Sequence, residues 1–373
     1  MNAGDQSGKP RIVVLFGGRS TEHGISCVTG GSVLAAVDTT KYDVVPVGIT
    51  QDGQWVLESG DLDRLKIKDR QTPTVDGSRP PVTLTQVEDG SELVVHEATG
   101  PRSLGHVDAV FPLLHGPWGE DGTLQGQLEM AGVRYVGAGV LASAVSMDKG
   151  FMKVALAAAG VPVMPSIVVT AREWARDAAE CRARSEELGY PLFVKPARGG
   201  SSIGISKVHD ASELDAAIAT AMEHDPRVLV EGFAAGVREI ECGVLQLPDG
   251  ELRTSLPAEI RIGGDHEFYD FEAKYLPGEH TEIDCPAKVD DDLLARMQEL
   301  AAVTFDAVAC EGLARVDFFA FPDGSLVVNE LNTMPGFTPS SMYPQMWGAS
   351  GIDYTELVDL LIQQALSRGT DLR

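Results

Sequence analysis

A turn signal between two β-prone runs near the C-terminus constrains the fold of this chain most tightly. The turn is the Pro-Asp-Gly sequence at 322–324, and Asp-Gly is a common two-residue loop in β-hairpins. With that loop, Asp317 lies directly opposite Glu330 in an antiparallel pair. Because side chains alternate along a strand, Arg315 and Asn332 share the same face. A three-residue loop would shift the register by one and carry Glu330 to the other face.

Two carboxylates that face each other across a hairpin need a partner of opposite charge. Like charges placed directly opposite destabilise a strand pair, and a hard cation between them reverses the sign of that interaction. Oxygen ligands of this kind suit Mg²⁺. The hairpin therefore predicts a magnesium site at Asp317 and Glu330.

Charge balance and cysteine usage limit the class of protein. The 373 residues leave room for two or three domains, and the formal net charge of −25 argues against nucleic acid or an anionic membrane as a partner. The five cysteines are scattered and lack CxxC spacing, which indicates reduced thiols in a cytosolic protein. No apolar run is long enough to span a membrane, and the N-terminus lacks a signal-peptide core. We therefore expect a cytoplasmic protein without membrane contacts.

The first third of the chain alternates strands with a helix. Residues 11–16, 42–50 and 107–115 have the composition of strands, and a helix is expected from the loop at 17–23 to about residue 37. A strand–helix–strand start of this kind implies a parallel sheet. Residues 59–105 are rich in Pro, Gly, Asp and Ser. We expect a surface insertion there, with one or two short strands.

Two further units follow. The second has a helix at 148–159 and another at 170–188, which opens with a capping box formed by Thr170 and Glu173. Its expected strands are 191–196, 205–208 and 228–231, and a further helix opens at Asp210. The third unit holds the hairpin, a helix near 291–309 and a terminal helix. The predicted fold class is α/β (α+β), with domains at 1–137, 138–232 and 233–373.

A Gly/Ser-rich loop at 195–204 joins two of the expected strands, with the sequence Lys-Pro-Ala-Arg-Gly-Gly-Ser-Ser-Ile-Gly. Glycines allow backbone N–H groups to point toward an anion, and the hydroxyls of Ser201 and Ser202 add donors. The loop lacks the GK[ST] ending of a P-loop and connects two strands. It is a candidate flap over phosphates or, with equal weight, an ordinary hairpin loop.

Three charged residues have both a ligand-binding interpretation and a simpler structural one. Lys149 and Lys195 could supply point charges for phosphates, although most lysines are solvated surface residues. In the loop at 17–23, Glu22 could bind a cationic amine, or it could simply favour the positive N-terminus of the next helix.

The loop that begins at His115 follows an apolar strand. Ligands of α/β sheets commonly bind at such positions. The simpler interpretation is that Glu120 and Asp121 cap the helix after this loop, and we expect that to hold in part.

Five motifs occur in order along the chain, and together they resemble the D-alanine–D-alanine ligase family of the ATP-grasp superfamily. They are Gly-Gly-Arg-Ser-Thr-Glu-His at 17–23, His-Gly-Pro-Trp-Gly-Glu-Asp-Gly-Thr-Leu-Gln-Gly at 115–126, Ser-Met-Asp-Lys at 146–149, Phe-Tyr-Asp-Phe-Glu-Ala-Lys-Tyr at 268–275 and Asn-Glu-Leu-Asn-Thr-Met-Pro-Gly at 329–336. The resemblance spans residues 11–362 and is poorest at 59–105. It implies an ATP-grasp fold with an N-terminal Rossmann-like parallel-sheet domain.

The resemblance also implies the residues that bind ATP and its metal ions. Two Mg²⁺ ions, for which Mn²⁺ could substitute, would be held by Asp317, Glu330 and Asn332. Contacts to the phosphates, the adenine and the ribose would come from Lys149, Lys195, Ser202, Glu231 and Glu239. Relatives carry a lysine after the adenine-binding glutamate, whereas this chain has Gly232 there, so the resemblance leaves the adenine contact at position 232 open.

The amino-acid subsites follow from the same resemblance. ATP would convert one D-alanine to an acyl phosphate, which the amine of a second D-alanine attacks, yielding a precursor of peptidoglycan. The first D-alanine would meet Glu22 and His115, and the flap would be tied to Glu22 through Ser201 and Tyr275. The second D-alanine and the developing negative charge would be bound by Lys274, Ser341, Arg315 and the backbone N–H of Gly336.

Three rival functions remain open. A ligase of the same fold could join D-alanine to D-lactate, but the resemblance associates tyrosine at position 275 with the dipeptide. Another ATP-grasp ligase, such as a carboxylase component, should lack the motifs of Glu22 and Tyr275. A non-catalytic nucleotide-binding protein should have lost the acidic set of the hairpin, yet this chain retains it. The family further leads us to expect a homodimer.

Overall fold

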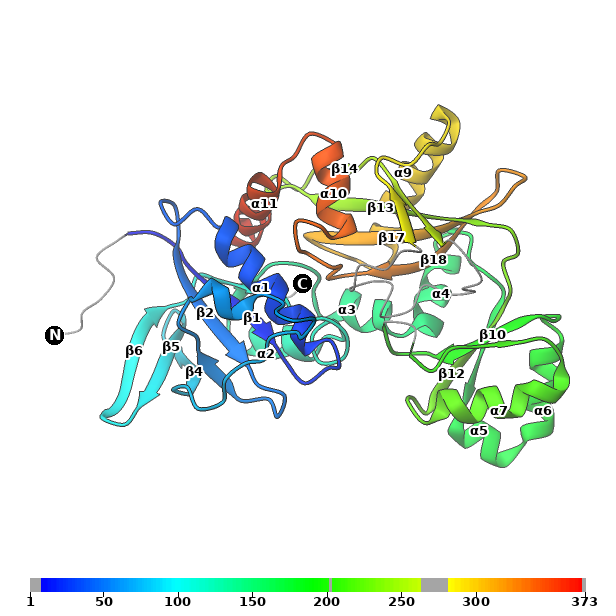
Figure 1. Cartoon of the computed structure of the whole chain (residues 1–373), viewed down its shortest axis with the longest axis horizontal. Helices are drawn as coiled ribbons and strands as arrows, with labels where there is room; N and C mark the ends of the chain where they lie inside the picture. The colour runs from blue at the N-terminus through cyan, green and yellow to red at the C-terminus, as the bar shows by residue number, and fades with distance from the viewer. Residues whose placement is uncertain (1–7, 201–202, 263–280, 371–373) are drawn as a thin grey trace.

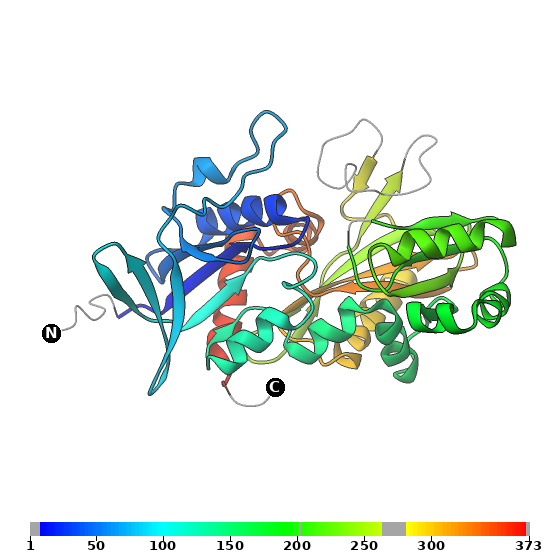
Figure 2. The ribbon, with the colours of Figure 1, turned by 90° about the horizontal axis from the view of Figure 1, so that it is seen from below.

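The computed structural model describes residues 8–200, 203–262 and 281–370. These residues form four sheets, which are joined and covered by helices (Figures 1 and 2). The mixture of a parallel sheet with antiparallel sheets agrees with the predicted α/β (α+β) class. Within the described ranges, no helix combines the length and the apolar character needed to cross a membrane.

The N-terminal sheet has the predicted strand–helix–strand start. Its strands lie in the order β3 (Trp55–Leu57), β2 (Asp43–Ile49), β1 (Arg11–Gly17), β7 (Ala109–Pro112) and β8 (Arg134–Tyr135). Strand β1 pairs in parallel with both β2 and β7, and α1 (His23–Ala36) connects β1 to β2. All of β1 is buried, as expected for a central strand that is covered on both faces.

The region at 59–105 holds more structure than expected. After a short 3₁₀ helix (Leu62–Leu65), it forms an antiparallel sheet of β4 (Val82–Val87), β5 (Gly90–Glu97) and β6 (Gly100–His106). The prediction of one or two strands was wrong, because two tight turns that end at Gly90 and Gly100 close two successive hairpins. Buried Leu93 and Val95 alternate with more exposed residues, which is the period-two signal of a strand.

The second unit contains a four-stranded antiparallel sheet. It begins with α3 (Val140–Met147) and α4 (Lys149–Ala158), and its strands lie in the order β11 (Ser206–Val208), β10 (Leu192–Pro196), β12 (Arg227–Gly232) and β9 (Ser166–Thr170). Helix α7 (Ala211–Met222) buries one apolar stripe toward this sheet. The capping box at Thr170 is present, but the helix that it opens is α5 (Ala171–Arg176). Asp177 ends it by capping α6 (Ala178–Glu186), so the prediction of one helix to residue 188 was wrong.

The third unit is built on a six-stranded antiparallel sheet. The strands follow the order β16 (Thr281–Asp284), β15 (Ala258–Ile262), β13 (Arg238–Gln246), β17 (Leu313–Ala320) and β18 (Leu326–Asn332), and β14 (Leu252–Thr254) pairs with β13. Helices α3 and α4 contribute to the same buried cluster as α9 (Asp291–Ala307) on one face of this sheet. The opposite face carries the polar residues described below.

The C-terminal helix joins the first and third units. Helices α10 (Met342–Ala349) and α11 (Tyr354–Ser367) follow the hairpin, and α11 lies beside α1 (Figure 1). Leu357 and Leu361 of α11 share a buried cluster with Ile12 of β1 and Leu245 of β13. The two sheets are therefore held by one continuous core, which fixes the polar face of β13 and β17 relative to the N-terminal loops.

Candidate active site

The hairpin of β17 and β18 places its acidic residues as predicted, although by a different route. Asp317 faces Glu330, and Arg315 faces Asn332. The loop has three residues, because the Phe321 N–H donates to the Ser325 carbonyl over 2.9 Å and Gly324 adopts a φ of 82°. The two-residue loop was therefore a wrong prediction. A β-bulge at Asn329 adds one residue to β18 and restores the register at the site.

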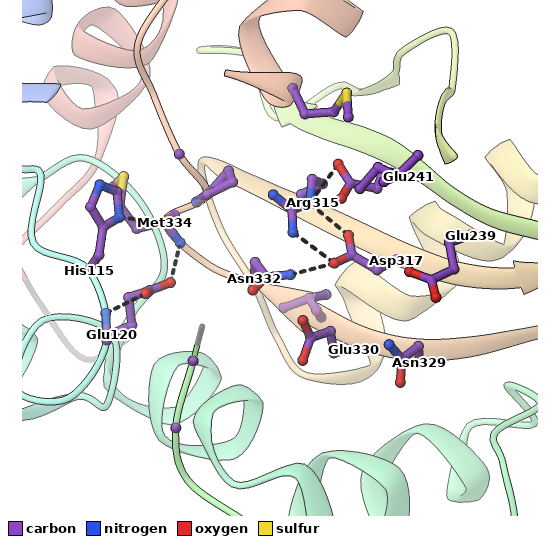
Figure 3. Close-up of a pocket in the computed structure, with 18 of the residues that line it drawn as sticks. His115, Glu120, Glu239, Glu241, Arg315, Asp317, Asn329, Glu330, Asn332 and Met334 are labelled. Atoms are coloured by element: carbon purple, nitrogen blue, oxygen red, sulfur yellow. Dashed lines mark hydrogen bonds and ion pairs between the residues drawn. The ribbon is translucent and has the colours of Figure 1, made fainter. Parts of the chain in front are cut away.

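Arg315 joins Asp317 of the hairpin and Glu241 of β13 in one network (Figure 3). Its Nε and Nη2 donate to the two carboxylate oxygens of Asp317 over 2.7 and 2.8 Å. The side-chain amide of Asn332 donates to the same carboxylate over 3.0 Å. Glu241 of β13 lies 3.1 Å from Nε on the other side. Burial alone would lower the pKa of Arg315, but Asp317 and Glu241 outweigh it and raise that pKa well above its ordinary value.

A second cluster of charges lies between the hairpin and the antiparallel sheet of β10 and β12. Lys149, at the start of α4, has its Nζ 3.3 Å from Glu330 and donates to the Gly199 carbonyl over 2.8 Å. This lysine therefore touches both the acidic hairpin and the Gly/Ser loop. Asp148 caps α4 by accepting from two backbone N–H groups, which fixes the start of the helix that carries Lys149.

Lys195 of β10 and Glu231 of β12 are diagonal neighbours in the ladder, where Glu231 lies opposite Phe193 and Lys195 opposite Leu229. The Nζ of Lys195 is 2.8 Å from one oxygen of Glu231, and the Nζ of Lys153 is 2.5 Å from the other. All three side chains are buried. Burial alone would raise the pKa of Glu231, but the two ammonium groups outweigh it and lower that pKa, so the carboxylate is ionised. Burial likewise lowers the pKa of Lys153 in spite of Glu231, whereas the charge of Glu231 outweighs burial at Lys195 and raises the pKa of that lysine.

The loop after β7 contacts the loop after β18 through the backbone N–H and the backbone carbonyl of Met334. The Nδ1 of His115 lies 3.1 Å from the Met334 carbonyl oxygen, and the Met334 N–H donates to Glu120 over 2.9 Å. The other oxygen of Glu120 accepts from the Gly116 N–H over 2.7 Å. Glu120 therefore does not cap α2 (Thr123–Met130), whereas Asp121 accepts from the Thr123 N–H as the capping interpretation predicted.

Burial perturbs both titratable groups of this contact. Burial lowers the pKa of His115 despite the nearby charge of Glu22, so the imidazole is neutral at neutral pH. Burial also raises the pKa of Glu120 to about 8, against the two backbone N–H groups that favour the carboxylate. Perturbed groups that line one cavity are typical of functional sites.

Glu22 is buried at the N-terminus of α1, and its side chain makes no capping hydrogen bond there. A Cβ atom at Gly116 would lie 2.8 Å from its Oε2, and one at Gly200 would lie 3.5 Å away. The carboxylate therefore sits between the His115 loop and the Gly/Ser loop. This position favours a binding role over the simpler helix-terminus interpretation.

Gly336 and Ser341 meet in the loop before α10. A Cβ atom at Gly336 would lie 3.1 Å from the Ser341 hydroxyl oxygen. That hydroxyl also accepts from the Thr338 N–H over 3.1 Å. The close approach favours glycine at position 336, because any side chain there would push on the Ser341 hydroxyl.

These groups surround a single pocket of about 680 Å³, and the predicted site residues that the structure describes all line it. They are Glu22, His115, Lys149, Lys195, Glu231, Glu239, Arg315, Asp317, Glu330, Asn332, Gly336 and Ser341. Four other predicted residues lie outside the described part of the chain, namely Ser201, Ser202, Lys274 and Tyr275.

The oxygen atoms of the hairpin are chemically suited to a hard divalent cation. Asp317 and Glu330 supply carboxylates and Asn332 an amide oxygen, the ligand types that Mg²⁺ and Mn²⁺ prefer. In the described ranges, no group of three or more His, Cys, Asp or Glu residues stands close enough to hold a metal by itself. A cation here would therefore need the amide as well as the two carboxylates, and a ligand such as phosphate would complete its coordination.

Sequence reasoning missed three residues that line or support this pocket. Lys153 lies one helical turn after Lys149, so it shares the same face of α4. Glu241 lies two residues after Glu239 and therefore shares its face of β13. The spacing along the sequence could have indicated both residues. It could not have indicated the strand pairing that brings Glu241 to Asp317. Glu120 was noticed only as a possible helix cap.

Comparisons with known proteins identify relatives along nearly the whole chain. Family models described as D-ala D-ala ligase N-terminus and C-terminus match residues 11–138 and 155–363. The D-alanine--D-alanine ligase of Arthrobacter sp. (strain FB24) is 56% identical over 98% of this chain and 96% of its own.

Two solved structures share the fold of this chain. The D-Ala:D-Ser ligase VanG from Enterococcus faecalis has a TM-score of 0.80 at 37% identity, covering 96% of this chain and 99% of that one. The D-alanine-D-alanine ligase from Coxiella burnetii has a TM-score of 0.80 at 34% identity, covering 96% and 94%.

Proposed function

Because this chain belongs to the D-alanine–D-alanine ligase family, we propose that its pocket joins two D-alanine molecules through an acyl phosphate at a two-metal site. The fold is ATP-grasp and the activity is ATP-dependent ligation of D-alanine to D-alanine for peptidoglycan synthesis. ATP is a co-substrate. The D-lactate alternative is not favoured by relatives of this identity and coverage. The observation that carries the mechanism is the convergence of the hairpin carboxylates, Lys149 and Glu22 on one pocket.

The ATP subsite lies between the antiparallel sheet and the hairpin. Lys149 and Lys195 bind phosphates, because their ammonium groups face the pocket beside Glu330 and Glu231. Glu231 and Glu239 bind the adenine and the ribose. The loop at 199–204, with Ser202, covers the phosphates, and its described end already accepts a hydrogen bond from Lys149.

Asp317, Glu330 and Asn332 hold two Mg²⁺ ions, or Mn²⁺ in their place, on the pocket face of the hairpin. When bound, such ions neutralise phosphate charge and stabilise the phosphoryl-transfer transition state. The bulge at Asn329 serves this site, because it sets Glu330 opposite Asp317 in spite of the longer turn.

The amino-acid subsites lie at the N-terminal end of the pocket. Glu22 binds the ammonium group of the first D-alanine, with neutral His115 nearby, and it is linked to the flap through Ser201 and Tyr275. Lys274 and Ser341 bind the carboxylate of the second D-alanine. Arg315 and the Gly336 N–H stabilise the negative charge that develops on oxygen in both steps. Closure of the pocket protects the acyl phosphate from water.

The organisation of the whole protein is proposed on the same basis. The domains span 1–137, 138–232 and 233–373, and the enzyme acts as a cytoplasmic homodimer. Its negative charge argues against nucleic acid as a partner, so the positive contacts for ATP are local to the pocket.

A phosphate-release assay tests the function directly. With ATP and Mg²⁺, D-alanine should release phosphate and form the dipeptide in equal amounts. L-Alanine should support neither, and D-lactate offered together with D-alanine should yield little ester. Phosphate release without dipeptide, or with L-alanine at the same rate, would contradict the proposal.

A further inference from the structure

Arg315 is shared by two carboxylates on neighbouring strands (Figure 3). Asp317 binds it through both oxygens, at 2.7 and 2.8 Å, and Glu241 contacts the Nε from the other side at 3.1 Å. Strand pairing sets this arrangement, because Glu241 lies opposite Asp317 in the ladder between β13 and β17. The guanidinium therefore has a second ion-pair partner, Glu241, that does not belong to the acidic set of the hairpin.

The bidentate pair of Arg315 and Asp317 engages the same oxygens that a divalent cation would need. A guanidinium and a metal ion compete for one carboxylate, since both are positive and both bind its oxygen lone pairs. Asp317 can serve a metal only if Arg315 gives up at least one of these hydrogen bonds. The guanidinium would then be short of a partner inside a pocket where unpaired charge is costly.

We propose that Glu241 is a positioning residue that retains Arg315 in the pocket when Asp317 turns its oxygens to a metal ion. This inference rests on the proposed two-metal function. Glu241 is only 5% exposed, and its side chain lines the pocket on the face shared with Glu239 and Asp317. By holding the Nε, it leaves the outer nitrogens of the guanidinium directed toward the reacting oxygens. Glu241 thereby raises the affinity of the site for the metal ion and orients the guanidinium of Arg315, without contacting the substrate itself.

Mn²⁺ binding measured by electron paramagnetic resonance in the absence of substrates tests this directly. Glu241→Gln keeps the shape and one acceptor oxygen but removes the charge. We expect its Mn²⁺ dissociation constant to rise about fivefold, because Arg315 then stays on Asp317. Arg315→Ala should bind Mn²⁺ about tenfold more tightly than wild type, because the competing cation is gone.

The double variant Glu241→Gln/Arg315→Ala distinguishes an effect of Glu241 that acts through Arg315 from a direct effect of its negative charge on the metal ion. If Glu241 acts through Arg315, Glu241→Gln should change Mn²⁺ affinity less than about twofold when Arg315 is already alanine. An equal loss of affinity in both backgrounds would overturn the proposal. Glu259→Gln is the matched control, because Glu259 is also buried and pairs through both oxygens with Arg238 on the adjacent strand. It should leave Mn²⁺ affinity and ligation close to wild type.

Turnover supplies a second readout. Glu241→Gln should lower kcat by about tenfold while KM for ATP changes by less than about twofold, because ATP binding does not depend on the orientation of the Arg315 guanidinium. If Glu241→Gln does not fold, Glu241→Asp retracts the carboxylate and should show smaller changes in the same direction. Failure of wild type to ligate D-alanine would refute the proposed function alone. Normal ligation without coupling in the Mn²⁺ cycle would refute the role of Glu241 alone.

Discussion

At the scale of single residues, the pocket depends on charges that are buried in pairs. Lys195 and Lys153 share Glu231, and Asp317 and Glu241 share Arg315. A buried ion that loses its partner costs several kcal/mol, so each group keeps its neighbour ionised and in place. The sequence indicated most of these residues by type and motif. It could not indicate their pairing, which depends on contacts between strands far apart in the chain.

Glu120 should make the stability of the protein fall as the pH rises. The folded state raises the pKa of Glu120 from 4.5 to about 8, so between these values the folded protein holds a proton that the unfolded chain releases. Stability from this group is complete at low pH and is lost as the pH rises toward 8. Chemical denaturation of wild type and Glu120→Gln between pH 5 and pH 9 measures it, and the variant should show a flatter profile. Parallel profiles of stability against pH for the two proteins would contradict the raised pKa of Glu120.

At the scale of elements, the bulged hairpin shows what sequence rules can and cannot supply. The turn residues and strand composition located both strands, and alternation placed Arg315, Asp317 and Asn332 on one face. The rule for loop length failed, because the chain forms a three-residue loop that ends at Gly324, whose φ is 82°, and not the two-residue loop that Asp-Gly favours. A single extra residue, Asn329, then corrected the register. Bulges have no reliable signal in one sequence, so this compensation was not predictable.

Substitution of Gly116 tests whether the close approach of the loop after β7 to Glu22 matters for activity. Its φ of 73° disfavours any other residue, and a Cβ atom there would lie 2.8 Å from the Glu22 carboxylate. Gly116→Ala should therefore displace Glu22 and lower kcat/KM for D-alanine by about tenfold or more, as a misplaced substrate contact does.

Gly126→Ala is the matched control for this change. Gly126 lies within α2, and no atom lies within 4 Å of the position of its Cβ. Its substitution should leave kcat/KM unchanged and add about 0.5–1 kcal/mol of stability, because alanine favours the helix. Equal kinetics for the two variants would show that the approach of Gly116 to Glu22 has no functional weight.

At the scale of the whole molecule, the C-terminal segment closes the N-terminal sheet onto the third unit. Arg368, just after α11, donates to the carbonyls of Tyr135 and Gly137 over 3.1 and 2.8 Å. Its own carbonyl accepts from Arg134 over 2.7 Å. The alternation of elements predicted the three units, but not that the last helix would pack on the first sheet. An amphipathic helix shows that it needs a partner and does not show which one.

Removing the contact between Arg368 and these carbonyls should lower stability and leave catalysis unchanged. Arg368→Ala leaves buried carbonyls without their donor, which should lower the free energy of unfolding by about 1–3 kcal/mol. Arg182→Ala, which breaks an exposed pair with Asp215, should cost much less stability, because solvent screens that pair. Denaturant titration measures both, and kcat per folded molecule should be unchanged. A loss for Arg368→Ala no larger than that for Arg182→Ala would contradict the account.

The facing carboxylates of the bulged hairpin are proposed to hold the metal ions of D-alanine ligation, and Glu330→Gln tests this role most directly. Dipeptide formation should be measured across a Mg²⁺ titration for wild type, Glu330→Gln and Asp323→Asn, a control at the exposed turn of the same hairpin. We expect Glu330→Gln to lose at least about a hundredfold in kcat at ordinary Mg²⁺, because metal stabilisation of phosphoryl transfer is worth several kcal/mol. Asp323→Asn should match wild type. Near-normal turnover of Glu330→Gln at the same Mg²⁺ would contradict the claim.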